Sequence, residues 1–165
     1  MGMDEELALH SQKVRFSREA TIALYRDVIN MPGADRCTCT YCRNFAAQRN
    51  KAYPEEFLHL LNQLGANSLK EWEAFEYGIA DENPKAWLYG GWFLFCGKLI
   101  EGTDHRPKQP KPFAFWFTSS FPNATLPKNQ EICAVEFLAE IPWVLAEMPD
   151  AKKGCKNSSL FVGIV

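Results

Sequence analysis

Three cysteines stand within six residues of the chain, at Cys37, Cys39 and Cys42. Thiolates this close together can chelate a soft metal ion, and they can also carry out thiol–disulfide exchange. The residues on either side are polar or charged, whereas a cysteine that serves only the hydrophobic core usually has apolar neighbours. This cluster is therefore the candidate functional site.

The spacing of these cysteines suits a metal site. If Cys37 and Cys39 lie in an extended stretch, their side chains point to the same side of the backbone. Cys42 would then fall in the first turn of the helix predicted to follow, where the positive helix end favours a thiolate. Three thiolates favour zinc, Cu(I) or an iron–sulfur cluster over hard cations, and zinc is the predicted cofactor.

A structural zinc site needs a fourth ligand, and the sequence holds no second CxxC motif to supply it. Cys155 is the first choice, because it lies in a lysine-rich polar stretch where a core role is not expected. Cys96 and Cys133 lie in apolar, strand-like segments and are expected to be core residues. The predicted metal ligands are Cys37, Cys39, Cys42 and Cys155.

Two other interpretations of the cluster stay open. Cys39 and Cys42 form a CxxC pair, which would suit a thiol oxidoreductase or redox sensor. A thioredoxin-like site follows a strand in a βαβ unit, whereas Met31, Pro32 and Gly33 precede this one. Alternatively, three reduced thiols simply pack the start of the helix, and the chain is a metal-free protein-interaction module.

Other polar residues give weaker signals. His59 is expected on the solvent face of its helix, His105 in a basic loop and His10 near the N-terminus. Glu136 interrupts an apolar strand pattern and could be a buried general base, although such a residue more often faces solvent or pairs with Arg or Lys.

The elements that position the cluster are predicted to be helical. A helix is expected over residues 40–51 with Thr40 as its cap. A second helix begins at Pro54 and ends before Gly65, which is a typical residue at a helix C-terminus. The capping-box pattern of residues 68–71 predicts a short third helix or a turn.

Strand patterns dominate the second half of the chain. Strands are expected over residues 86–100, 113–117 and 132–138, and the first of these is apolar on both faces, as in a central strand. Pro142 favours an edge or irregular position for residues 141–145, and residues 160–165 could add an edge strand. The expected core residues are Phe57, Leu61, Trp92, Phe95, Phe115 and Phe137.

These patterns predict the fold class α+β, with an antiparallel sheet in the second half packed against two or three helices from the first half. With 165 residues, the chain is expected to form a single domain over residues 1–165. Within it, residues 13–34 are strand-like, with a weak strand signal at 21–25. Residues 35–66 hold the cysteine knuckle and two helices, and 72–165 are mainly antiparallel sheet.

Composition and motifs argue against several classes of function. The net charge of −2 argues against a nucleic-acid surface. No apolar run is long enough to span a membrane, and the acidic N-terminus lacks a secretory signal, so a cytoplasmic location is expected. The chain has no GxSxG, no HExxH and no Gly-rich phosphate loop, which favours a binding protein over an enzyme.

The motif of residues 37–45, CxCxxCxNF, is followed by Tyr53-Pro54 and a helix that ends in Leu64-Gly65. Tyr89-Gly-Gly-Trp92 and the PWVL segment at 142–145 come later. In these motifs the chain resembles a small family of uncharacterised bacterial proteins, over most of residues 35–145. The family has no assigned function, so the resemblance implies a shared fold and supplies no mechanism or substrate.

Together these observations predict a cytoplasmic binding or interaction protein of bacterial type, with a structural zinc knuckle. Its expected partner is a protein, and neither nucleic acid nor a membrane is expected to bind. The sequence gives no indication of the oligomeric state.

Overall fold

The computed structural model of the chain describes residues 5–27, 33–103, 106–107, 112–121 and 129–150. The fold is α+β, as the sequence predicts, with an antiparallel sheet of six strands and three α-helices in the described residues. The elements in chain order are β1 (Glu5–Leu9), β2 (Gln12–Phe16), α1 (Arg18–Asp27), the 3-10 turn η1 (Ala34–Arg36), α2 (Thr40–Ala52), α3 (Glu55–Leu64), β3 (Glu73–Ile79), β4 (Ala86–Glu101), β5 (Phe113–Thr118) and β6 (Ile132–Pro142).

The sheet is organised around β4, its longest strand. The strand order is β1-β2-β4-β6-β5, and β3 also pairs with β4. β6 follows one edge of β4 from Ala86 to Cys96. The other edge is shared, because β3 pairs with the first part of β4 as far as Trp92 and β2 pairs with the last part from Gly97 onward.

Helix α1 fills the gap between β2 and β3 on this shared edge. The Tyr25 hydroxyl donates to the Leu94 carbonyl at 3.0 Å, and the Thr21 hydroxyl accepts from the Cys96 amide at 3.0 Å. These side chains take the place of a neighbouring strand, so the backbone polar groups of β4 are satisfied where no strand pairs with them.

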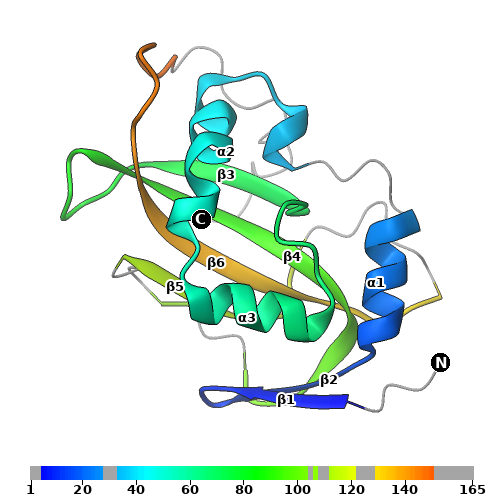
Figure 1. Ribbon diagram of the computed structural model, residues 1–165. Coiled ribbons are helices and arrows are strands. Elements are labelled where there is room, and N and C mark those ends of the chain that lie inside the picture. Colours follow the sequence, from blue (N-terminus) through cyan, green and yellow to red (C-terminus); the bar gives the residue numbers. More distant parts are fainter. Residues whose placement is uncertain (1–4, 28–32, 104–105, 108–111, 122–128, 151–165) are drawn as a thin grey trace.

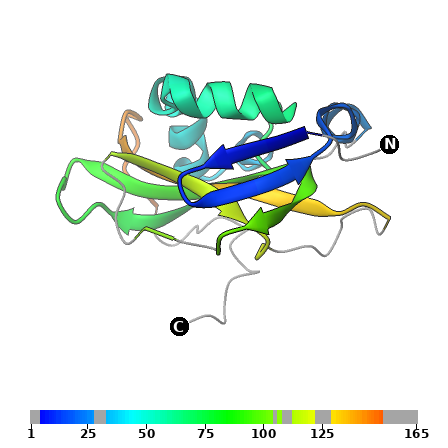
Figure 2. The ribbon, with the colours of Figure 1, turned by 90° about the horizontal axis from the view of Figure 1, so that it is seen from below.

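The main core lies between the sheet and the layer formed by α2 and α3, which cover one face of the sheet (Figure 2). Phe45 of α2 and Phe57 of α3 meet Phe93 and Phe137 from the sheet. The expected core residues Phe57, Leu61, Trp92, Phe95 and Phe137 are buried, whereas Phe115 is only half-buried.

The opposite face of β4 is also apolar, as predicted for a central strand. Trp92, Leu94 and Cys96 form a second cluster with Leu24 and Tyr25 of α1. Both Cys96 and Cys133 are buried, which confirms that these two cysteines are core residues.

The prediction of strand-like structure over residues 13–34 is wrong for its central part. Residues 21–25 lie in α1, although β2 does cover residues 13–16. The Ser17 hydroxyl accepts from the Ala20 amide at 3.2 Å, which is the hydrogen bond of a helix N-cap. Thr21, Leu24 and Tyr25 are buried at the i, i+3, i+4 spacing of a helix, so tertiary packing overrides their weak preference for strands.

Residues 141–145 were predicted to lie at an edge or in an irregular segment, and this holds for 143–145, which follow the end of β6. Ile141 instead belongs to β6 and is fully buried, and Pro142 is tolerated because it is the last residue of that strand. Strands β1 and β3 were not predicted, since their glutamates break the apolar pattern. The segment 160–165, predicted as an edge strand, lies outside the described residues.

None of the helices in the described part of the chain has the length and apolar character that a membrane crossing requires.

Candidate metal centre

The three cysteines lie at the junction between η1 and α2. Cys37, directly after η1, and Cys39, directly before α2, both have extended backbone conformations, with φ/ψ of −108°/134° and −66°/156°. Cys42 lies in the first turn of α2. This is the local geometry that the spacing predicts, and it places all three Sγ atoms within 4.8 Å of one another.

This separation suits a metal ion held by sulfur. In a tetrahedral zinc site the Zn–S bonds are about 2.3 Å long, which places the sulfurs about 3.8 Å apart. The three thiols are therefore gathered close to the arrangement that a shared ion needs. Within the residues that the structure describes, theirs is the one group of three or more Cys, His, Asp or Glu side chains gathered so closely.

Cys39 also acts as the N-cap of α2. Its Sγ accepts a hydrogen bond from the Cys42 amide at 3.4 Å, a position usually taken by the oxygen of Ser, Thr, Asp or Asn. Thr40, predicted to be the cap, is the first residue of the helix instead. Because the N-terminus of a helix carries partial positive charge, it favours Cys39 in its anionic form.

The cluster is accessible on one side only. Cys42 is buried in the main core, whereas Cys37 and Cys39 are half-buried. Burial raises the pKa of the adjacent Tyr41 hydroxyl, and the negative charges of Glu76, Asp150 and Cys39 add to that rise. Arg43, which pairs with Glu147, also interacts electrostatically with Cys39, so charges of both signs surround the thiols.

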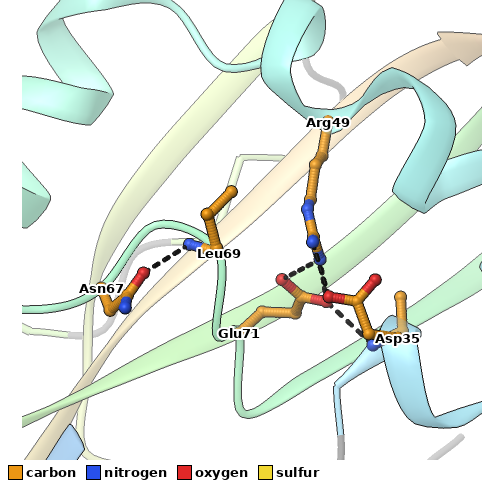
Figure 3. A network of polar contacts seen from close by, with 6 residues as sticks. Asp35, Arg49, Asn67, Leu69 and Glu71 are labelled. Atoms are coloured by element: carbon orange, nitrogen blue, oxygen red, sulfur yellow. Dashed lines mark hydrogen bonds and ion pairs between the residues drawn. The ribbon is translucent and has the colours of Figure 1, made fainter.

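A buried ion-pair network fixes the turn that carries Cys37 (Figure 3). Arg49 of α2 donates to Glu71 Oε1 and Oε2 at 3.0 and 3.1 Å and to Asp35 Oδ2 at 2.6 Å. Glu71 also accepts from the Ala34 amide at 2.8 Å. The network therefore joins η1, α2 and the segment before β3, and it holds the cysteine-bearing junction in place.

Glu71 is almost fully enclosed, with 1% of its surface exposed. Burial raises the pKa of its carboxyl group, and the Arg49 charge and the Ala34 amide oppose that rise. Gly33 permits this close packing, because a Cβ atom there would stand 2.5 Å from the Glu71 carbonyl oxygen.

Glu71 was predicted as part of a capping box, and the segment forms a turn rather than a helix. The Asn67 side chain accepts from the Leu69 amide at 2.9 Å (Figure 3), and the Asn67 carbonyl accepts from the Lys70 amide at 2.9 Å. An Asx turn of this kind competes with helix formation. The Glu71 carboxylate is then directed inward to Arg49.

Sequence reasoning missed Arg49 and Glu71 as residues that position the site. One signal was present, because Arg49 shares the helical spacing of Phe45 and Ala46 on the apolar side of α2. A charged residue on an apolar stripe has to find a buried partner, yet nothing in the sequence indicates which carboxylate provides it.

Of the remaining candidates, those that the structure describes do not join the cluster. His59 is exposed on α3 and His10 lies in the β1–β2 turn. Glu136 is buried on the far face of the sheet, with Arg106 Nε at 3.8 Å from its carboxylate, as in a structural ion pair. Cys155, the predicted fourth ligand, and His105 lie outside the described residues.

Comparison of the chain with protein-family models, with curated proteins and with solved structures finds no match. The resemblance to a bacterial family accordingly stays a prediction. What can be concluded about function depends on the geometry of the cysteine cluster and its surroundings.

Proposed function

We propose that Cys37, Cys39 and Cys42 hold one zinc ion with a structural role, in a cytoplasmic protein that binds a protein partner. The observation that carries this proposal is the gathering of three Sγ atoms within 4.8 Å at the N-terminus of α2. Thiolates select soft or borderline metals, and zinc is the metal that most often joins thiolates in structural sites.

The place of the cluster in the fold supports a structural role. Cys37 is attached to η1, a turn of only three residues, and Cys42 to α2. An ion bound by both would cross-link the short turn to the helix that covers the sheet. Since metal-binding free energy is also folding free energy, zinc would stabilise this junction directly.

Cys155 is kept as the proposed fourth ligand. The last described residue, Asp150, donates its amide hydrogen to the Thr40 hydroxyl at 3.3 Å, next to Cys39. Cys155 follows Asp150 by five positions in the sequence, and a chain of that length spans at most about 18 Å. Cys155 is therefore within covalent reach of the cluster. A water molecule in the fourth position is the alternative.

Exposed apolar side chains around Trp87, whose ring contacts Tyr41 of α2, support the binding of a protein. Ile79 is 57% exposed and lies opposite Trp87 in the sheet. The Trp87 ring lies 5.7 Å from that of Trp143, and the next residue, Val144, is 49% exposed. Neighbouring apolar residues at the surface are typical of interaction sites.

The test is elemental analysis of the purified protein combined with a count of accessible thiols on the same sample. One zinc per chain and protected thiols are expected. Cys42→Ser should abolish zinc binding, and Cys133→Ala, at a buried cysteine outside the cluster, is the control that should retain it. A protein free of metal, whose thiols react at ordinary rates, would rule out the zinc site and leave a metal-free interaction module.

A redox role for Cys39 and Cys42 is the second candidate, and the N-cap geometry favours it. Cys39 is half-buried, and its Sγ accepts from the Cys42 amide at the positive end of α2, an environment that activates thiols. The alkylation rate of Cys39 measured against pH separates the two functions. A metal-free protein with one rapidly reacting thiol would replace the zinc proposal by the redox one.

A further inference from the structure

The segment that follows β6, residues 143–150, runs back along α2 toward its N-terminal end (Figure 1). We refer to these residues as the strap. The strap is not part of the sheet, and its Met148 is 80% exposed. Its contacts with α2 are nevertheless specific, and they fall on the turn that carries the cysteines.

Asn44 holds the beginning of the strap. Its side-chain nitrogen donates to the Pro142 carbonyl at 3.0 Å, and its side-chain oxygen accepts from the Val144 amide at 2.8 Å. Asn44 is fully buried, so its amide would lose these partners, at considerable cost, if the strap moved away. The ring of Trp143 also packs edge-on against Tyr41, at 5.8 Å between centroids.

Two further contacts hold the end of the strap. Arg43 forms an ion pair with Glu147, and the Thr40 hydroxyl accepts from the Asp150 amide at 3.3 Å. Inside the strap, the Trp143 indole donates to the Glu147 carbonyl at 2.8 Å, which keeps the loop compact.

The α2 residues that hold the strap are neighbours of the proposed metal ligands in the sequence. Thr40 and Tyr41 lie between Cys39 and Cys42, and Arg43 and Asn44 directly follow Cys42. The first turn of a helix is its weakest part, because its amides have no partners within the helix. A metal on Cys39 and Cys42 stabilises the folded form of this turn, which is also the form that the strap binds.

Resting on the proposed zinc site, we propose that metal binding and strap docking are thermodynamically linked. Two groups that bind the same folded form of one turn strengthen each other, and the coupling is equal in both directions. Zinc keeps the strap on α2. Loss of zinc releases the strap and uncovers the aromatic rings of Tyr41 and Trp87, which lie 5.1 Å apart beneath Trp143. The metal thus regulates which apolar surface the protein offers to a partner.

The first test is hydrogen exchange on the full-length protein, loaded with zinc or treated with a chelator. The reporters are the amides of Val144 and Asp150, which donate hydrogen bonds to α2. Their exchange should accelerate about 5- to 150-fold without zinc, the usual range of coupling between sites. The amides of Leu61 and Phe93, in α3 and β4, should exchange at unchanged rates as internal controls.

Zinc content measured on the same sample separates the possible failures. If one zinc ion is removed and the strap amides keep their exchange rates, the linkage is wrong and the zinc site stands. If no zinc is bound at the start, the zinc site and the linkage are both wrong.

A matched pair of variants tests the reverse direction. Glu147→Gln removes the exposed ion pair with Arg43, and Glu131→Gln removes a similarly exposed pair with Lys98 far from the cysteines. In a competition assay with a chromophoric chelator, Glu147→Gln should weaken zinc binding about 1.5- to 5-fold, as expected for an exposed ion pair. Glu131→Gln should leave it unchanged. Equal affinities in the two variants would overturn the linkage.

Discussion

The two ends of α2 are held in place in opposite ways. At the C-terminal end, Arg49 is enclosed by Glu71 and Asp35, and its side chain is 9% exposed. At the N-terminal end, Cys39 is half-buried and the ion pair of Arg43 with Glu147 is open to solvent. The buried end is fixed once the chain has folded. The open end depends on thiol chemistry and ions, so a change in conditions can alter one end of α2 and leave the other in place.

The largest expected effect comes from the open end. Removing zinc with a strong chelator should lower the free energy of unfolding by about 5 kcal/mol or more, since structural zinc contributes roughly 10–16 kcal/mol in zinc-finger peptides. Thermal melting with and without chelator measures this difference. Cys39→Ser should melt like the chelated wild type and should not respond to the chelator. If wild type melts at one temperature in both conditions, the two ends of α2 do not differ as described.

The buried end should show a smaller loss of stability, most of which persists without the metal. Glu71→Ala leaves Arg49 without its main partner in the interior, and removal of one member of a buried ion pair costs about 3–5 kcal/mol. Urea unfolding of this variant and of Glu131→Ala, an exposed control, measures the effect. Most of the loss should remain after chelation, because the unpaired Arg49 charge is buried in either state, and the share that disappears measures how far the network also positions Cys37. A loss that disappears entirely on chelation would mean that both ends act as one unit.

A change in α3 provides a reference that belongs to neither end. Leu61 is fully buried, and Leu61→Ala should cost about 2–5 kcal/mol through lost burial and a cavity. Urea unfolding should give the same cost in the zinc-loaded and chelated protein. A cost that depends on the metal would show that zinc stabilises the whole helical layer and not the first turn of α2 alone.

The smallest expected effect is the change with pH in the stability that Glu71 contributes at the buried end of α2. Burial raises the pKa of Glu71 in the folded protein, so its stabilising contribution is complete below its unfolded pKa of about 4.3. That contribution is lost as the pH rises through the folded pKa. The difference in unfolding free energy, wild type minus Glu71→Gln, should therefore fall as the pH rises from 4 to 7. A difference that grows with pH would mean that Arg49 outweighs burial.

The parts of the site that the sequence predicts are local in the chain. Cys37, Cys39 and Cys42 converge because a residue period of two in extended backbone and the following helical turn determine their directions. The same holds for α3 and its terminal Gly65, whose φ of 80° requires a residue that tolerates the left-handed region.

The parts that were missed depend on contacts between distant segments. Asn44 meets Val144 across 100 positions of sequence, and Arg49 meets Glu71 across 22. Spacing along one element says nothing about such partners, since they are determined by how the elements pack. For the same reason residues 21–25 were assigned to a strand, because their helical conformation depends on burial against β4.

The way α1 completes the edge of β4 has a consequence for solubility. The side chains of Thr21 and Tyr25 form hydrogen bonds with the Cys96 amide and the Leu94 carbonyl. These two backbone groups lie in the part of β4 that pairs with neither β2 nor β3. An unoccupied stretch of strand edge is a template onto which another chain can add a strand, and it is a common origin of aggregation. Helix α1 therefore shields the longest strand of the sheet from other copies of the protein, and a change that detaches α1 would favour precipitation before the rest of the fold is lost.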